Sequence, residues 1–495
     1  MRLYEILKGV ETSDIDGDPE ADVSGISYDS RKVKQGHIFI AFHGEKYDGH
    51  DFIADAINKG AIAIVCEKPS VSLQQSAVSL ISVKDSREAL AKISNNFFMR
   101  PSTKLDVIGI TGTNGKTTTS YLIKSILESW GKTVGLIGTI QHMIKDETCS
   151  AVHTTPEALE FQELLHRMLG SGCTHVVSEV SSHALAQKRI DGTVFKACVF
   201  TNLTRDHLDF HKTMDDYFMA KERLFIELLS EDGTSVINFD DLYGRRLLSA
   251  LGSRLSALRK TFTYGLEAGS DIMAAEIVNS FDGLRFNILM NDKKYSVTSP
   301  LMGLPNVYNI LSAAGAAASL GVPWDVILDG IKKAGTVKGR FEKVDMGQDF
   351  LAIIDYAHTE DALERLIYTA RGLTKGKIIT VFGCGGDRDR GKRPTMGSIA
   401  TKLSDFVVIT SDNPRSEDPE KIISEIEAGA VRRNYLIEPN RKEAVKRSVM
   451  MASEGDVVLI AGKGHESYQE TKGQRIKFSD REVLEEAIRQ LINNS

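Results

Sequence analysis

The stretch LDVIGITGTNGKTTT, residues 105–119, decides the fold of the central part of this 495-residue chain. Residues 105–110 form an apolar run that predicts a buried strand, and a helix is expected from Lys116 to Trp130. The turn between them, residues 111–117, holds two glycines and a lysine. Its backbone N–H groups and the helix N-terminus can surround phosphate oxygens. This order of elements predicts a nucleotide-binding loop in an α/β domain.

The loop departs from the strict phosphate-loop pattern GxxxxGK[ST] at one position. Ile110 stands where the first glycine is expected, although Gly112 and Gly115 still permit unusual backbone angles. Thr117 can place its hydroxyl on Mg²⁺. Such a loop would equally suit a kinase, a GTPase or a motor protein, so the type of reaction depends on other residues.

Composition is that of a soluble multidomain protein. Hydrophobic residues make up 42% and charged residues 26% of the chain, and the net charge of −6 gives no general attraction to nucleic acid or anionic membranes. The five cysteines form no CxxC pair, so neither a disulfide framework nor a zinc site is expected. Because residues 1–11 lack an apolar leader and no run of about 18 apolar residues occurs, we expect a cytoplasmic protein without membrane insertion.

The length predicts three α/β domains at about 150 residues each. We expect a small N-terminal domain over residues 1–100, a central parallel-sheet, ATPase-like domain with the P-loop over 101–338, and a Rossmann-like domain over 339–495. A helix is expected at residues 51–59. Strands are expected at residues 37–42, 61–65, 105–110, 133–137, 175–180, 197–201, 350–354, 377–382, 406–410 and 457–461.

Polar clusters follow the four strands predicted in the third domain. They occupy residues 355–358, 383–393, 411–417 and 462–466. Such residues are common in any loop between a strand and a helix. Ligands of open parallel sheets bind at the carboxyl ends of the strands, so four clusters at one sheet edge favour a ligand site.

The central region adds candidates for metal and substrate chemistry. Glu179 lies at the end of a predicted strand, where a carboxylate can hold Mg²⁺ beside phosphates. Residues 206–211 contain two histidines and two aspartates, a density suited to metal or substrate contacts. Lys221 lies on a predicted helix and by itself indicates only a surface lysine. A structural role remains the alternative for Glu179 and for either histidine.

Together these motifs resemble the Mur ligase family, which uses ATP to join an amino acid to a growing UDP-N-acetylmuramoyl peptide. The resemblance covers essentially the whole chain. It rests on TGTNGKTTT at 111–119, HTTPE at 153–157, EVSSHAL at 179–185, TNLTRDHLDFH at 201–211, AKERLF at 220–225, GLPNVYNILSAAG at 303–315, GRFE at 339–342 and DYAHTEDAL at 355–363. It implies an enzyme of peptidoglycan synthesis, and hence of cell shape and cell division, with ATP as co-substrate and Mg²⁺ as cofactor.

The resemblance also implies the members of the ATP and metal sites. ATP would be bound by Thr111, Gly112, Thr113, Asn114, Gly115, Lys116, Thr117, Asn309, Arg340 and Asp355. The metal ligands would be Thr117, Glu179, His207 and Lys221, and the catalytic residues Lys116, Glu179, His207 and Lys221. In the family the lysine that matches Lys221 is carbamylated to N6-carboxylysine, a carboxylate that can help coordinate magnesium. Domain closure would complete the site.

The members of the family that add the third amino acid match best. Their nucleotide substrate is UDP-N-acetylmuramoyl-L-alanyl-D-glutamate. The matching contacts would be Ser30, Thr154, Thr155, Ser181, Gln187 and Arg189. No contact is assigned in the loop 44–49.

The motif Asp412-Asn413-Pro414-Arg415 matches members that add meso-diaminopimelate, whereas members that add lysine usually lack the arginine. Diaminopimelate differs from lysine by a distal carboxylate, which an arginine fork can bind bidentately. The remaining contacts would be Arg388, Gly462 and Glu466, of which Glu466 suits an ammonium group. The alternative is that this motif only forms a turn.

The implied reaction proceeds through an acyl phosphate, and His358 is a candidate for assisting deprotonation of the incoming amine. Addition of L-lysine, a folylpolyglutamate synthase-like ligase and a regulatory P-loop NTPase are the alternatives. Residues 1–100 argue against the synthase, because such enzymes generally begin near the ATP domain. The strand-end clusters of the third domain argue against the regulatory protein. Small molecules are the expected partners, without nucleic acid, and a monomer is expected.

Overall fold

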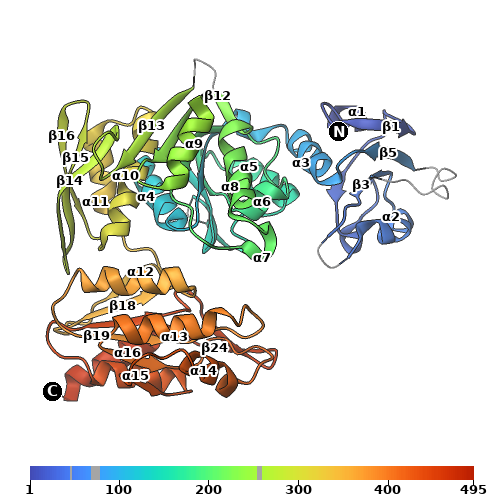
Figure 1. The fold of residues 1–495 in the computed structure, drawn as a ribbon. Helices are drawn as coiled ribbons and strands as arrows, with labels where there is room; N and C mark the ends of the chain where they lie inside the picture. Colours follow the sequence, from blue (N-terminus) through green and yellow to red (C-terminus); the bar gives the residue numbers. More distant parts are fainter. Residues whose placement is uncertain (45–46, 68–77, 146, 253–258, 495) are drawn as a thin grey trace. The chain divides into compact units, whose positions relative to one another are not determined.

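The computed structural model describes residues 1–44, 47–67, 78–145, 147–252 and 259–494. Helices and mainly parallel sheets alternate along these residues, which confirms the predicted α/β class (Figure 1). The chain divides into two compact units, residues 1–272 with 312–327 and residues 273–311 with 328–495. No helix in the described part of the chain is long and apolar enough to cross a membrane.

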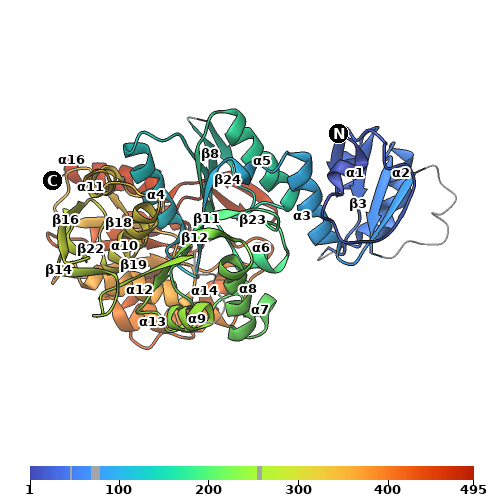
Figure 2. The same cartoon turned by 90° about the horizontal axis from the view of Figure 1, so that it is seen from above.

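The N-terminal part of the first unit is built on a five-stranded sheet of order β1-β5-β4-β3-β2. All neighbours are parallel except the β1–β5 pair. Its elements are α1 (Leu3–Ile6), β1 (Thr12–Asp16), β2 (Gly25–Ser27), η1 (Ser30–Lys32), β3 (His37–Ile40), η2 (Gly49–Phe52), α2 (Ile53–Asn58), β4 (Ala63–Cys66), β5 (Ser79–Val83) and α3 (Ser86–Phe97). Asp85 caps α3 by accepting hydrogen bonds from the N–H groups of Arg87 and Glu88. α3 packs against α5 of the central sheet (Figure 2).

The central sheet follows the order β13-β12-β11-β6-β10-β7-β8-β9 within the first unit. Its elements are η4 (Pro101–Thr103), β6 (Asp106–Thr111), α4 (Lys116–Ser129), β7 (Val134–Ile137), β8 (Gln141–Ile144), β9 (Glu147–Ser150), α5 (Ala158–Gly170), β10 (His175–Glu179), α6 (Ser182–Ala186), β11 (Phe195–Phe200), α7 (Leu208–His211), α8 (Met214–Ile226), β12 (Leu229–Asn238), α9 (Leu242–Gly252) and β13 (Lys260–Gly265). The strands from β13 to β7 are parallel, as predicted. The antiparallel edge β8–β9 was not predicted.

Burial explains why β6 lies at the centre of this sheet. Its apolar run is covered on both faces, and a Cβ at Gly109 would come within 2.8 Å of the Phe195 ring. Glycine therefore lets the aromatic side chain pack directly on the strand. The phosphate loop thus begins at the end of a fully packed strand.

The second unit contains an antiparallel meander of β14 (Ile272–Ser280), β15 (Gly283–Met290) and β16 (Lys293–Ser299). The helices α10 (Leu304–Ser319) and α11 (Trp324–Lys333) follow it. None of the three strands was predicted, because exposed polar residues interrupt their apolar positions.

The rest of the second unit is a six-stranded sheet of order β17-β18-β22-β19-β20-β21, parallel except for β17. Its elements are β17 (Glu342–Val344), β18 (Leu351–Asp355), α12 (Glu360–Arg371), β19 (Ile378–Phe382), α13 (Lys392–Leu403), β20 (Phe406–Ile409), α14 (Pro419–Glu427), β21 (Tyr435–Ile437), α15 (Arg441–Met450), β22 (Val457–Ala461), β23 (Tyr468–Thr471), β24 (Gln474–Lys477) and α16 (Asp480–Asn494). β23 and β24 form a separate hairpin.

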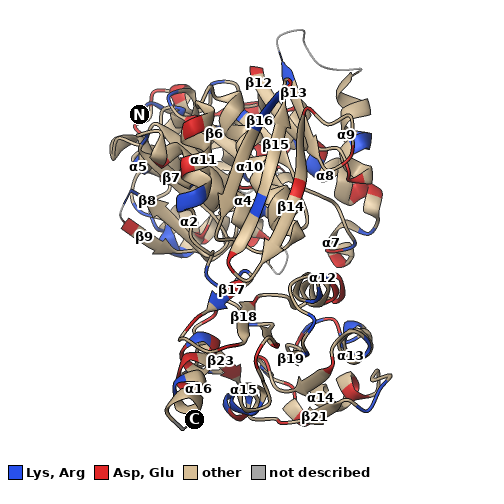
Figure 3. Ribbon diagram, turned by 90° about the vertical axis from the view of Figure 1, so that its left-hand side faces the viewer, with Lys and Arg blue, Asp and Glu red and all other residues tan. Residues whose placement is uncertain are grey.

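Alternating side chains of this sheet build two cores. Leu351 and Ile353 of β18 pack with residues of α12, α13 and α14, whereas Ala352 and Ile354 pack with residues of α15 and α16. Figure 3 shows α13 and α16 on opposite sides of the sheet, and acidic and basic residues interspersed along its helices. The sheet is therefore covered on both faces, and the carboxyl ends of its parallel strands form the edge at which open sheets of this kind generally bind ligands.

Candidate functional site

The phosphate loop lies between β6 and α4, as the sequence predicts. Gly112 has φ +146°, and a Cβ there would lie 1.9 Å from Thr201 Oγ1. The N–H of Asn114 donates to the Asn202 side chain over 3.0 Å, which fixes the loop to the end of β11. Lys116 Nζ donates to the carbonyl oxygens of Gly112 and Thr113, each over 2.9 Å. The predicted loop is thus anchored from the neighbouring strand, and its lysine lies against it.

Glu179 is a fully buried carboxylate at the end of β10. It accepts hydrogen bonds from Thr117 Oγ1 (2.9 Å), from the N–H of Thr139 (3.0 Å) and from Thr139 Oγ1 (2.9 Å). Thr139 Oγ1 also lies 3.0 Å from Thr154 Oγ1. Within the described residues the hydrogen-bond partners of Glu179 are therefore neutral. A buried carboxylate next to a threonine hydroxyl fits Mg²⁺, which prefers oxygen ligands. Sequence reasoning missed Thr139, which lies outside every motif that carried the resemblance.

Lys221 is buried, with 1% of its surface exposed, so the surface position that its helix alone indicates is wrong. Its Nζ donates to Gly112 O over 3.0 Å and to Thr111 Oγ1 over 3.4 Å, and lies 4.7 Å from the centre of the Tyr217 ring. Burial, together with the charge of Lys116, holds the pKa of Lys221 well below its usual value. The uncharged amine is therefore more populated at neutral pH than for an ordinary lysine.

His207 precedes α7 and has a left-handed backbone, with φ +53°. Its ring lies 4.8 Å from that of His183 and 6.0 Å from that of Tyr217, and its Nε2 lies 3.4 Å from Asp206 Oδ2. Partial burial, which removes water from the ring, is the main cause that lowers the pKa of His207. The charges of Lys116 and Lys221 add to this effect, and Asp206 opposes it. A neutral imidazole near two lysines can act as a metal ligand. Tyr217, whose hydroxyl lies 3.1 Å from Thr113 Oγ1, connects His207 to the phosphate loop.

A pocket of about 710 Å³ lies between the N-terminal and central sheets of the first unit. Three of the six residues predicted to bind the nucleotide peptide line it: Ser30, Gln187 and Arg189. The other three lie near Glu179, where Thr155 Oγ1 donates to the Glu179 carbonyl oxygen and the N–H of Ser181 donates to Thr155 Oγ1. Arg189 connects the two groups, since its Nη1 donates to Thr155 O over 3.1 Å.

The same pocket contains residues that sequence reasoning missed. Arg87 and Glu157 line it. Arg87 lies 4.3 Å from the centre of the Phe42 ring, and the Glu157 carboxylate lies between Arg87 (3.5 Å) and Arg189 (2.9 Å). Arg87 and Arg189 are far apart in the sequence, so their common contact with Glu157 becomes visible only when the fold shows that their segments meet.

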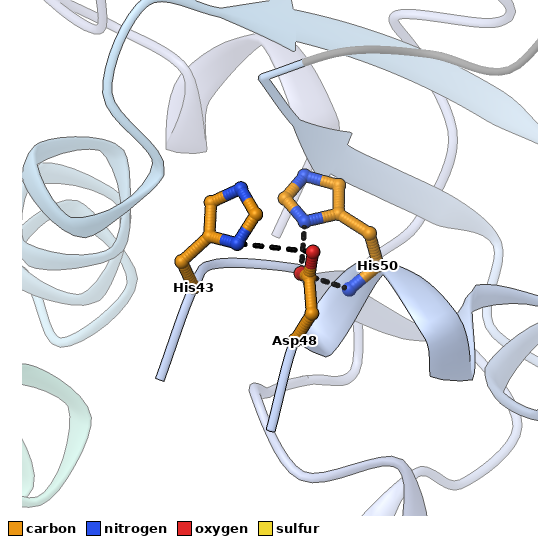
Figure 4. A group of neighbouring side chains, drawn as sticks. All are labelled: His43, Asp48 and His50. Atoms are coloured by element: carbon orange, nitrogen blue, oxygen red, sulfur yellow. Dashed lines mark hydrogen bonds and ion pairs between the residues drawn. The ribbon is translucent and has the colours of Figure 1, made fainter. Parts of the chain in front are cut away.

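A histidine-aspartate group lies at residues 43–50 of the N-terminal part (Figure 4). His43, Asp48 and His50 bring potential metal-ligating atoms within 4.8 Å of one another, and both rings face the carboxylate. His50 Nδ1 lies 2.6 Å from Asp48 Oδ1, and His50 Nε2 accepts from the N–H of Glu67 over 3.4 Å. Because Nε2 is an acceptor, the ring proton is on Nδ1 and points to Asp48. The group is therefore better described as a hydrogen-bonded cluster than as a metal centre. Residues 45 and 46 belong to the loop 44–49, in which no substrate contact was assigned from the sequence, and they lie outside the described residues.

The second unit contains the other three residues of the predicted ATP site. The Asp355 carboxylate accepts from the N–H groups of Phe341 (2.7 Å) and Ala357 (2.8 Å), which fixes the turn that carries Arg340. Burial raises the pKa of Asp355, and Arg340 opposes this rise. Asn309 Nδ2 donates to Asn306 Oδ1 over 2.9 Å. Their arrangement with the phosphate loop around one ATP molecule remains a prediction. His358, near Asp355, is exposed, and its Nδ1 lies 2.9 Å from Tyr356 O.

The predicted amino-acid site lies at the carboxyl ends of β20 and β22, the two strands that flank β19. Asn413 Nδ2 donates to Glu466 Oε2 over 2.8 Å, and a Cβ at Gly462 would lie 2.7 Å from Asp412 Oδ2. The predicted residues in the loop after β20 and in the loop after β22 are therefore in contact. Arg388 is exposed on the loop after β19.

The hairpin β23–β24 fixes the predicted arginine. Arg415 has a left-handed backbone, with φ +52°, a strained conformation for a residue with a side chain. Its N–H donates to Glu470 O over 3.0 Å, and its Nη1 donates to Gly386 O over 2.6 Å. A turn alone, the alternative for this motif, would not require a separate hairpin to hold the arginine. The hairpin was not predicted.

Comparisons with known proteins agree with this architecture. Family models match residues 22–98 (Mur ligase family, catalytic domain), 110–317 (Mur ligase middle domain) and 339–464 (Mur ligase, glutamate ligase domain). A UDP-N-acetylmuramoyl-L-alanyl-D-glutamate--2,6-diaminopimelate ligase of Solibacter usitatus is 46% identical over 95% of this chain and 94% of its own length. The relative of the same name from Caldanaerobacter subterraneus is 44% identical over 99% of both chains.

Solved structures show the same fold. The structure of a UDP-N-acetylmuramoyl-L-alanyl-D-glutamate--2,6-diaminopimelate ligase is 34% identical, with a TM-score of 0.74 and 99% of both chains covered. A folylpolyglutamate synthase of Mycobacterium tuberculosis shares the fold at 16% identity and a TM-score of 0.62, over 82% of this chain and 96% of its own. With family models on all three parts of the chain and full-length relatives above 40% identity, this chain belongs to the Mur ligase family.

Proposed function

We propose that this chain is an ATP-dependent ligase that adds meso-diaminopimelate to UDP-N-acetylmuramoyl-L-alanyl-D-glutamate in peptidoglycan synthesis. Relatives that are 43–46% identical over nearly the whole chain have the name of that 2,6-diaminopimelate ligase. The observation that carries the proposal is the loop Asp412-Asn413-Pro414-Arg415, which the hairpin β23–β24 holds beside Glu466. An arginine and a glutamate suit the distal carboxylate and an ammonium group of diaminopimelate.

Each part of the chain has its own role in the proposal. Residues 1–100 would bind the UDP-sugar, residues 101–338 would bind ATP, and residues 339–495 would bind the amino acid. The pocket lined by Ser30, Gln187 and Arg189 is proposed to hold the nucleotide peptide. The substrates are small and water-soluble, and we propose that a monomer acts on them in the cytoplasm.

The reaction would proceed in two steps. The D-glutamyl carboxylate attacks the γ-phosphorus of ATP, which forms an acyl phosphate and releases ADP. The amine of diaminopimelate then attacks the acyl carbon, forms the amide and releases phosphate. Lys116 would balance the charge that builds up on the transferring phosphoryl group. His358 would assist removal of the proton from the amine.

The metal site of the proposal consists of Thr117, Glu179, His207 and carbamylated Lys221. Its support is the buried Glu179 carboxylate with neutral hydrogen-bond partners in the described residues, next to the hydroxyl of Thr117. Bound Mg²⁺ would neutralise the repulsion between carboxylate and phosphate. Thr139 would keep Glu179 oriented toward Thr117 through its hydrogen bonds.

Reconstitution tests the reaction. Purified protein is mixed with ATP, Mg²⁺, UDP-N-acetylmuramoyl-L-alanyl-D-glutamate and either diaminopimelate or L-lysine, and phosphate release and tripeptide are measured. We expect turnover with diaminopimelate that stops when a chelator removes Mg²⁺. Turnover with lysine alone would establish the first alternative, and ATP hydrolysis without amide formation would establish a regulatory NTPase.

Arg415→Ala is expected to raise the KM for diaminopimelate by about 10- to 100-fold, because a charge-assisted hydrogen bond contributes about 1.5–3 kcal/mol. The KM values for ATP and for the nucleotide peptide should stay within about twofold of wild type. Arg475→Ala is the matched control, since Arg475 lies on the same hairpin with its charge 4.5 Å from the Tyr468 ring. An unchanged KM for diaminopimelate in Arg415→Ala would remove Arg415 from the recognition site.

A further inference from the structure

Lys463 is a buried cation inside the proposed amino-acid site, and the sequence placed it in the cluster 462–466 without assigning it a role. It follows β22 and has no exposed side-chain surface. Gly462 and Gly464 flank it with φ +115° and φ +53°. A Cβ at Gly464 would come within 2.8 Å of Tyr356 Cβ, so the backbone passes too close to its neighbours for side chains on either side of the lysine.

The ammonium group of Lys463 joins two residues of the site. Its Nζ donates to Asn413 Oδ1 over 2.9 Å and to Glu466 Oε2 over 3.1 Å. Asn413 Nδ2 donates to the same Glu466 oxygen over 2.8 Å, and Asn413 Oδ1 also accepts from the N–H of Glu470. The three side chains therefore form a closed triangle that is tied to the hairpin β23–β24.

This triangle leaves the two oxygens of Glu466 in different roles. Oε2 accepts from both Asn413 and Lys463, whereas no hydrogen bond reaches Oε1 within the described residues. The Glu466 side chain is 18% exposed, in contrast to the fully buried lysine. A ligand can therefore reach Glu466 but not Lys463.

We propose that Lys463 is a positioning residue for the amino-acid substrate. It fixes Asn413 and Glu466 as one unit, so that Glu466 presents Oε1 to an ammonium group of the incoming amino acid. A buried lysine loses its hydration on folding, and the carboxylate and amide oxygens replace that hydration. The inference rests on the proposed function, because it assigns the ligand of Glu466 to the amino acid.

The test compares Lys463→Met with Lys463→Arg in the full-length enzyme. We expect Lys463→Met to raise the KM for diaminopimelate by at least about tenfold, with the KM values for ATP and nucleotide peptide within about twofold of wild type. Lys463→Arg, which keeps the charge, should recover part of the loss. If the methionine variant does not fold, Lys463→Gln is used with the same expectation, since it keeps a donor without the charge.

A second arm separates positioning from general destabilisation. Leu484 lies in the core between the sheet and α16, away from the triangle, so Leu484→Ala should lower the melting temperature without a selective rise in the KM for diaminopimelate. In addition, Lys463→Met combined with Glu466→Gln should cost no more than Glu466→Gln alone, because the lysine acts through the glutamate. Additive losses, or equal rises in all three KM values, would overturn the proposal.

The outcome for wild type keeps the two proposals apart. If wild type does not use diaminopimelate, the proposed function fails, and the same variants are compared with the amino acid that wild type does use. A KM for that amino acid unaffected by Lys463→Met would then overturn the positioning role as well.

Discussion

Replacing Lys221 with alanine is expected to lower kcat by about 100- to 1000-fold, the range measured when one group that stabilises transition-state charge is removed. A small carboxylic acid such as acetate should restore part of the activity. The truncated side chain leaves space beside Gly112 and Tyr217, and a carboxylate that enters it would replace the carbamate. The measurement is kcat of the variant as a function of added acid.

The environment of Lys221 favours formation of the carbamate. Burial and the nearby charge of Lys116 lower its pKa, and the uncharged amine is the form that reacts with carbon dioxide. In that step the nitrogen lone pair attacks the carbon, an N–C bond forms, one proton is lost and a carboxylate results. A neutral amine is thereby converted into an anion beside the residues proposed to hold Mg²⁺.

Lys221→Met is the control for the rescue experiment. Methionine fills the volume of the lysine side chain but provides neither an amine nor space for an added acid, so the acid should not restore its activity. Full activity of Lys221→Ala without added acid would show that no carbamate is needed for the reaction.

The fold could be predicted wherever a continuous apolar run was followed by a glycine-rich or polar loop. β6, β10, β18 and β22 are buried on both faces, and their positions agree with the sequence prediction within a residue or two. β1 and β16 are mostly exposed, so no apolar pattern marked them. The hydropathy pattern detects a strand whose own residues are apolar and buried. It does not detect a mostly exposed strand, which is defined by its pairing with a distant strand.

The candidate site was predicted where a residue type is tied to a motif, and missed where its role comes from tertiary contacts. Lys116 and Arg415 belong to recognisable sequences. Only the fold brings Thr139 to Glu179. Lys463 lies in the predicted cluster 462–466, but nothing in the sequence showed that its ammonium group joins Glu466 to Asn413. Burial of Lys221 also depends on the packing of α8 against β6, which no local pattern reveals.

Replacing Arg441 with methionine is expected to destabilise the second unit by about 3–5 kcal/mol, because it leaves a buried carboxylate without its partner. Arg441 and Asp480 both have fully buried side chains. Arg441 Nε and Nη2 donate to the two oxygens of Asp480, each over 2.7 Å. The pair joins the first residue of α15 to the first residue of α16. Calorimetry should record a fall of roughly 6–20 °C in the melting temperature of this unit.

The same arginine extends its effect to the proposed amino-acid site. Its Nη2 donates to Ala461 O over 2.9 Å and its Nη1 to Ser411 O over 3.3 Å, immediately before Gly462 and Asp412. The double variant Arg441→Met with Asp480→Leu removes both charges, so it should recover much of the lost stability. Arg441→Met should also raise the KM for diaminopimelate, and the double variant should not restore it, because the carbonyl oxygens of Ser411 and Ala461 still lack their donor. A double variant as unstable as Arg441→Met would show that these carbonyl contacts, rather than the unpaired carboxylate, account for the loss.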